Sequence, residues 1–171
     1  MINKDQLQDL ITRTLKDLDA ECKVMFTQSA VDLLMMTAAH ESRLGTYIKQ
    51  QGGPALGIFQ MEPATHEDHW EYITPRGWLY DALVAMNLEC DTNASTMEYN
   101  LRYAIVMARI HYYRQPEALP EETERYRGMG GKEEYLRKLA VYCKKYYNTS
   151  AGKATALKYL SDYNELVLDI R

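Results

Sequence analysis

One glutamate in this sequence is placed where a carboxyl group can act as an acid. Glu41 lies seven residues after Leu34 and three after Ala38, in a run of apolar residues at helical spacing. This spacing directs its side chain close to the apolar face of the helix. Burial disfavours the ionised form of a carboxyl group and raises its pKa, which suits a proton donor near neutral pH. We therefore predict that Glu41 is a general acid with a raised pKa.

A glycine-rich loop and a compact motif follow this residue. The loop is Gln-Gly-Gly-Pro at 51–54, and the motif is Gly-Ile-Phe-Gln-Met-Glu-Pro-Ala-Thr at 57–65. Together with the Glu-Ser pair before them, residues 40–65 resemble the catalytic core of soluble lytic transglycosylases and goose-type lysozymes. That core has a Glu-Ser pair ending a buried helix, a Gly-aliphatic-bulky-Gln unit and a Pro-x-Thr helix start, in the same order and at the same spacing.

The resemblance implies an activity and a set of site residues. In that family the glutamate is the sole catalytic acid and base, and the glycine and glutamine line the groove that holds the sugar N-acetyl group. Carried over, these residues are Glu41, Gly57 and Gln60. The neighbours that we add as candidate substrate-binding residues are Ser42, Ile58 and Phe59. The resemblance implies no metal and no cofactor.

Two later signatures of the family also have counterparts. Its Asn-Ile-x-x-Gly unit at a helix start is similar to the segment that begins at Asn100, where Ala104 replaces the glycine. Its Ala-x-Tyr-Asn unit, whose tyrosine hydrogen-bonds the catalytic carboxyl, is similar to the segment around Tyr142, which lacks the asparagine. A Tyr-Asn pair at Tyr147 offers a rival register. Asn100 and Tyr142 are therefore further candidate substrate-binding residues.

The chemistry that the resemblance implies begins with one proton transfer. Glu41 would protonate the glycosidic oxygen between N-acetylmuramic acid and N-acetylglucosamine in peptidoglycan. Attack by the sugar's own C6 hydroxyl then gives a 1,6-anhydro product, whereas attack by water gives a reducing end. An inverting hydrolase needs a second carboxylate roughly 6.5–9.5 Å away to hold that water. The sequence leaves both routes open, and the available carboxylates are Glu62, Glu67, Asp68 and Glu71.

Metal sites are the main competing interpretation of the histidines. His40 and Glu41 match the start of a zinc-protease helix, but position 44, where the second histidine belongs, is Leu44. His66 and His69 lie one helical turn apart, without a matching histidine or cysteine pair. We predict that these two histidines lie on a solvated helix face.

The elements that position these residues are predicted to be helical throughout, with no run of alternation typical of strands. The predicted fold is therefore all-α, and the resemblance implies a lysozyme-like (SLT-type transglycosylase) domain over residues 1–171. Residues 115–132, rich in proline and glycine, are predicted to form a flexible surface insertion.

Predicted caps are Thr27 or Ser29 for the second helix and Ser95 or Thr96 for the fifth. The predicted helices cover 4–19, 27 or 29 to about 45, 63–73, 77–88, 95–114, 133–147 and 151–169.

Composition and charge restrict the function classes. The chain has 171 residues, 46% of them hydrophobic, and a net charge of −4, which argues against nucleic-acid binding. The sequence begins with no apolar core typical of a signal peptide, and it has no apolar run long enough to span a membrane. Three cysteines at irregular spacings are expected to be free thiols. Within the family that the sequence resembles, the lack of an export signal, the acidic balance and the inserted loop look like a bacteriophage or prophage version. Such a protein would be made in the bacterial cytoplasm, associated with the virion, delivered to the periplasm or cell wall and partnered by other virion or lysis proteins.

A second hypothesis comes from a different class of function. The alanine at position 104, the missing asparagine after Tyr142 and the acidic balance of the chain also fit a catalytically inactive glycan-binding or virion structural module on the same scaffold. A scaffold hosts many functions, so a resemblance of fold does not choose between the two.

Overall fold

The computed structural model describes residues 1–22, 24–88, 93–122, 131–148 and 154–170. These residues form α-helices joined by loops and contain no strand, which confirms the all-α prediction. The helices are α1 (Lys4–Glu21), α2 (Gln28–Ser42), α3 (Pro63–Ile73), α4 (Gly77–Ala85), α5 (Thr96–Tyr99), α6 (Leu101–Tyr113), α7 (Gly131–Tyr146) and α8 (Ala156–Leu166).

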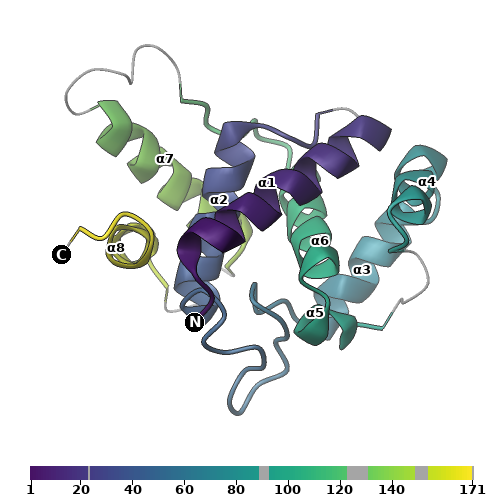
Figure 1. The fold of residues 1–171 in the computed structure, drawn as a ribbon, viewed down its shortest axis with the longest axis horizontal. Helices are drawn as coiled ribbons and strands as arrows, with labels where there is room; N and C mark the ends of the chain where they lie inside the picture. The colour runs from purple at the N-terminus through teal and green to yellow at the C-terminus, as the bar shows by residue number, and fades with distance from the viewer. Residues whose placement is uncertain (23, 89–92, 123–130, 149–153, 171) are drawn as a thin grey trace.

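Helix α2 lies at the centre of the fold and carries Glu41 near its C-terminal end. Nearly all of its side chains are buried, as in a helix surrounded by other elements rather than docked by one face. It packs against α1, α6, α7 and α8. Figure 1 shows α1 crossing in front of α2, with α7 and α8 to one side and α6, α3 and α4 to the other. The helix begins as predicted, because the Thr27 side chain accepts a hydrogen bond from the Ala30 backbone N–H at 3.0 Å.

Helix α1 docks on this centre by a single stripe. Its buried side chains recur every three or four residues, as the sequence predicts, and face α2 and α6. Each leucine or isoleucine buried in this way contributes about 1.5–3 kcal/mol relative to an exposed position. The residues of the stripe are Leu7, Ile11, Thr14, Leu15 and Leu18. The apolar face of α1 therefore packs against both α2 and α6.

The predicted helix over 95–114 is two helices rather than one. Asn100 has an extended backbone conformation between α5 and α6, and its side chain accepts a hydrogen bond from the Tyr103 backbone N–H at 3.0 Å. This satisfies one of the free N–H groups at the start of α6. The prediction that Ser95 or Thr96 caps this helix is wrong, because the cap that α6 needs is supplied by Asn100.

The prediction of a solvated face for His66 and His69 is also wrong. Both side chains are buried, because this face of α3 packs on α6. The Nε2 atom of His66 lies 2.6 Å from the Tyr103 hydroxyl, and Arg114 donates a hydrogen bond to Nδ1 of His69 at 2.9 Å. Burial, with His111 and Arg114 nearby, lowers the pKa of His69 to about 3. His69 is therefore a neutral part of the core.

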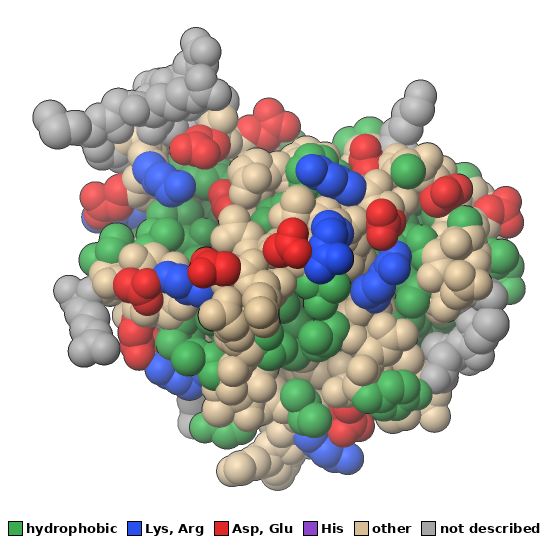
Figure 2. All heavy atoms as spheres, in the orientation of Figure 1, with side chains coloured by type: hydrophobic (Ala, Val, Ile, Leu, Met, Phe, Trp, Pro, Cys, Tyr) green, Lys and Arg blue, Asp and Glu red, His purple; other side chains and the backbone are tan. Residues whose placement is uncertain are grey.

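The outer surface carries mixed charge. On the face shown in Figure 2, acidic and basic side chains are interspersed with apolar ones, without a broad basic area. None of the helices in the described ranges is long and apolar enough to cross a membrane.

Cys22 and Cys143 are free and buried, as expected, whereas Cys90 lies outside the described residues. Of the predicted insertion, residues 115–122 contain no helix, 123–130 lie outside the described residues, and 131–132 belong to α7.

We expect the protein to lose stability as the pH falls from 6.5 towards 3. His69 takes up a proton near pH 6.5 when unfolded but only near pH 3 when folded. Each pH unit in this window therefore costs up to about 1.4 kcal/mol for this one proton. His69→Asn, which keeps an acceptor for Arg114, should give a shallower decline in denaturant titrations across this range. The stability of the variant should still decline somewhat with falling pH, because burial also lowers the pKa of His111. An unchanged slope would show that His69 does not titrate on unfolding.

Candidate active site

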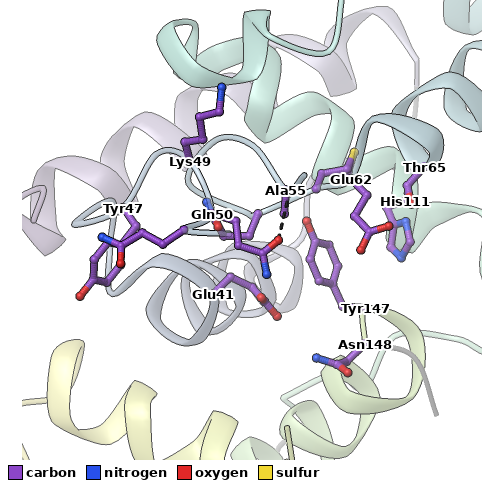
Figure 3. A pocket seen from close by; sticks show the side chains of 13 residues that line it. Glu41, Tyr47, Lys49, Gln50, Ala55, Glu62, Thr65, His111, Tyr147 and Asn148 are labelled. Carbon is purple, nitrogen blue, oxygen red and sulfur yellow. Dashed lines mark hydrogen bonds between the residues drawn. The ribbon is translucent and has the colours of Figure 1, made fainter. Parts of the chain in front are cut away.

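A cleft of about 600 Å³ lies beside the C-terminal end of α2. This volume is typical of small-molecule sites, which span about 300–1,000 Å³. In Figure 3 the Glu41 carboxyl lies between Tyr47 on one side and Tyr147, Glu62 and His111 on the other. The residues that line the cleft are Glu41, Tyr47, Lys49, Gln50, Gln51, Ala55, Gln60, Met61, Glu62, Thr65, His111, Tyr147 and Asn148.

The Glu41 carboxyl is held by a tyrosine from the last helix. The hydroxyl of Tyr159 in α8 donates a hydrogen bond to Oε1 of Glu41 at 2.6 Å. Burial raises the pKa of Tyr159 beyond the ordinary range of a phenol, so the hydroxyl keeps its proton and remains a donor. No basic side chain among the described residues forms an ion pair with Glu41. The carboxyl group is therefore oriented by a neutral donor, and this hydrogen bond does not require the carboxyl to be ionised.

Burial raises the pKa of Glu41, as the sequence predicted. The hydrogen bond from Tyr159 and the proximity of His40 act in the opposite direction and offset part of this effect. The carboxyl also lies in the last turn of α2, where the unpaired backbone carbonyl groups disfavour a negative charge. Glu41 therefore holds its proton at a higher pH than an exposed glutamate does.

The turn after α2 carries the chain out of the core towards the cleft. Three successive residues, Arg43, Leu44 and Gly45, have left-handed backbone conformations with φ of 50°, 53° and 75°. Ser42 fixes this turn, since its buried hydroxyl donates to the Ala38 carbonyl and accepts from the Gly45 N–H at 2.8 Å. Ser42 is therefore part of the scaffold beside Glu41 and not of the cleft wall.

The motif at 57–60 forms the opposite wall. Leu56 and Met61 pair through two backbone hydrogen bonds and enclose a tight turn, in which Gln60 has a left-handed conformation with φ of 46°. The Gln60 side-chain N–H donates to the Gly57 carbonyl at 2.7 Å, which fixes the amide at the edge of the cleft. Gly57, with φ of 73°, passes so close to α5 that a Cβ atom would lie 2.5 Å from the Met97 carbonyl oxygen. Only glycine allows this approach.

The structure brings only part of the predicted site together. Glu41 and Gln60 both line the cleft. Gly57 shapes the turn behind it, and Ile58 and Phe59 are buried in the core, where apolar side chains of a tight turn pack inward. Asn100 caps α6 and does not line the cleft.

Tyr142 is not the tyrosine next to the acid. Its hydroxyl donates to the Glu117 carbonyl at 2.9 Å, because this face of α7 packs against the segment after α6. Tyr147, the rival, lines the cleft but donates to the Phe59 carbonyl at 2.7 Å. The hydrogen bond to Glu41 comes instead from Tyr159, which sequence analysis missed. The sequence offered no signal for it, since the two residues are 118 positions apart and α8 has no recognisable motif.

Two further groups define the far end of the cleft. His111 donates from Nε2 to the Tyr146 carbonyl at 2.6 Å, and burial lowers its pKa, so the ring is neutral there. Of the four acids considered as a second carboxylate, only Glu62 lines the cleft. Asp68 is paired with Arg114, and Glu67 and Glu71 line other hollows of the surface.

No metal site of three or more histidine, cysteine, aspartate or glutamate side chains occurs among the described residues. Comparison of the chain with models of protein families, with curated proteins and with solved structures gave no match. The functional interpretation therefore rests on the residues and geometry of the cleft.

We expect Glu41→Gln to be more stable than the native protein at neutral pH. A raised carboxyl pKa means that the stabilisation of the folded state is present at low pH and is lost as the pH rises through the folded pKa. The amide never ionises and can still accept the Tyr159 hydrogen bond. Denaturant titrations should show the advantage of the variant growing from acid to neutral pH. Parallel stability curves for the two proteins would contradict a raised pKa.

Proposed function

We propose that this protein cleaves the β-1,4 bond between N-acetylmuramic acid and N-acetylglucosamine in peptidoglycan. Glu41 acts as the general acid, on a lysozyme-like scaffold of the soluble lytic transglycosylase type. The observation that carries the proposal is a partly buried carboxyl group whose pKa is raised by burial and which lines an open cleft. Burying such a group costs stability, and groups of this kind concentrate at catalytic sites.

The chemistry of the cleft wall supports a sugar substrate. Besides Glu41, most of the wall is made of amide, hydroxyl and aromatic side chains, which hydrogen-bond and stack with sugar rings. Neutral donors and acceptors suit hydroxyl and N-acetyl groups, which carry no charge. The amides are Gln50, Gln51, Gln60 and Asn148. The fixed amide of Gln60 is the group that we assign to the N-acetyl substituent.

The geometry supports a mechanism with one carboxyl group. Glu41 gives its proton to the glycosidic oxygen as the bond breaks, and the Tyr159 hydroxyl then stabilises the carboxylate that is left. The ionised Glu41 can next accept the proton of the attacking hydroxyl. Glu62 is exposed, and no described residue hydrogen-bonds its side chain, so nothing fixes it over a water molecule. We therefore favour attack by the C6 hydroxyl and a 1,6-anhydro product.

The biological setting that fits this activity is the one expected from the sequence. We propose a bacteriophage or prophage protein that reaches the cell wall with other virion or lysis proteins. The mixed surface charge on the face in Figure 2 offers no broad basic area for an anionic polymer, which favours delivery over free diffusion.

Glu41→Gln should abolish release of glycan fragments from purified cell-wall sacculi. Loss of a general acid costs about 10²- to 10⁴-fold in rate. Turbidity and mass spectrometry of the soluble fragments measure the release. Arg43→Gln, at a half-exposed residue outside the cleft, is the matched control and should keep the native rate.

Equal release by the Glu41→Gln and native proteins would reject Glu41 as the acid. Binding of the native protein to sacculi without solubilising them would instead establish the alternative, an inactive glycan-binding module.

Glu62→Gln should leave the products unchanged, with 1,6-anhydro ends and a nearly native rate. The C6 hydroxyl belongs to the sugar itself and needs no second carboxylate to position it. Mass spectrometry distinguishes an anhydro end from a reducing end by the mass of one water molecule. Reducing ends whose formation is lost in Glu62→Gln would show that water attacks and that Glu62 is its base.

A further inference from the structure

Three residues of α8 gather around the last turn of α2. Tyr159 contacts two successive residues there, since its hydroxyl binds Glu41 and its ring lies against the ring of His40, with centroids 3.8 Å apart. One turn further along α8, Asp162 accepts a hydrogen bond from Nδ1 of His40 at 2.8 Å. Lys158 donates to the second oxygen of the same carboxylate. Asp162 thus connects His40 to Lys158 beside the tyrosine.

We propose that the His40–Asp162–Lys158 cluster positions Tyr159 against Glu41. The His40 ring packs against the phenol ring of Tyr159, Asp162 holds the His40 ring through its Nδ1 atom, and Lys158 holds the Asp162 carboxylate. These three are positioning residues, since none of them lines the cleft. The proposal deepens the proposed function, because it names what orients the general acid.

The physical reason is that apolar packing alone does not fix a helix along its axis. The hydrophobic effect is non-directional, and each residue along α8 is displaced by about 1.5 Å from the next. The 2.6 Å hydrogen bond between Tyr159 and Glu41 requires the two helices to be placed more accurately than one such displacement. The hydrogen bond that His40 donates to Asp162 is directional and joins α2 to α8, so it restricts both the height and the rotation of α8 at Tyr159.

Stability alone does not explain why an ionic group is buried here. The Asp162 side chain is only 4% exposed. Removing the Asp162 carboxylate from water costs about as much as its contacts with His40 and the half-exposed Lys158 return, so these contacts contribute little net stability. The best-supported use of a buried ion pair in proteins is to specify register. At this position, the register that is specified is that of Tyr159.

A second ion pair joins the same helices and provides the control. Arg43 and Glu165 lie 2.8 Å apart, at the end of α2 and in α8, and their side chains are 43% and 47% exposed. This pair contacts neither Tyr159 nor Glu41. Exposed pairs of this kind contribute little to stability. Arg43 has only a weaker electrostatic interaction with Asp162 besides, so Arg43→Gln removes a link between the helices and leaves every hydrogen bond of the cluster in place.

The test is a double-mutant cycle between Asp162→Asn and Tyr159→Phe. The readouts are the pKa of the Glu41 carboxyl, measured by carbon-13 NMR, and kcat and KM on soluble uncross-linked glycan chains. Tyr159→Phe should raise the pKa of Glu41, because it deletes a hydrogen bond that favours the ionised form. It should also lower kcat on the order of tenfold with little change in KM, the pattern expected when a reacting group is misplaced.

Asp162→Asn should also raise the pKa of Glu41 and lower kcat, but it should do neither in the Tyr159→Phe background. Direct loss of the negative charge would lower that pKa instead, so the sign separates positioning from charge. The same change in both backgrounds would overturn the proposal, since two residues that act through one hydroxyl cannot be additive. No change in either background, as expected for Arg43→Gln, would also overturn it.

A second variant protects the test against misfolding. His40→Phe keeps a ring against Tyr159 but deletes the donor to Asp162. Because His40 also lowers the pKa of Glu41 directly, this variant should raise that pKa in both backgrounds, and by more when Tyr159 is present. The NMR readout needs no activity. If the native protein does not cleave glycan but the pKa pattern is as expected, only the proposed function is rejected. If it cleaves glycan but the pKa pattern is absent, only the positioning role is rejected.

Discussion

The site depends on keeping the Glu41 carboxyl partly buried at the cleft without an ion pair to a lysine or arginine. A lysine or arginine in contact with Glu41 would favour the carboxylate and remove the proton that the proposed general acid has to donate. A fully unpartnered carboxyl would be free to rotate. The Tyr159 hydroxyl meets both requirements, since it is a neutral donor at 2.6 Å that orients the group and offsets part of the burial cost.

This requirement explains why distant parts of the chain converge at the end of α2. Helix α2 is buried all round, so the approach to Glu41 is set by the elements packed on it. Helix α8 brings the tyrosine, and the turn at 57–60 brings the fixed amide of Gln60. The left-handed residues at Arg43, Leu44 and Gln60 cost backbone energy, which the packed core supports. Backbone strain therefore occurs both in the turn that follows Glu41 and in the turn that presents Gln60 across the cleft.

Sequence analysis predicted the parts of this arrangement that depend on residues close together in the chain. Helical spacing identified the buried direction of Glu41, and Pro63 after a turn marked the start of α3. It was less accurate where one residue type can have two roles. Asn100 was predicted to bind substrate, but an asparagine before a helix can equally be its N-cap, and Asn100 caps α6. The Tyr159 contact could not be predicted, since it depends on how α8 packs on α2, and such packing leaves no periodic pattern. Tyr142 was chosen from a motif, but the rotation of α7 directs it to Glu117.

A crystal structure of the Glu41→Gln variant with an oligosaccharide of alternating N-acetylglucosamine and N-acetylmuramic acid tests the central claim most directly. The account predicts sugar rings in the cleft, with a glycosidic oxygen within roughly 3.2 Å of the amide at position 41. It also predicts an N-acetyl group beside Gln60. An oligosaccharide bound elsewhere on the surface, or in the cleft with its glycosidic oxygens out of reach of position 41, would contradict it.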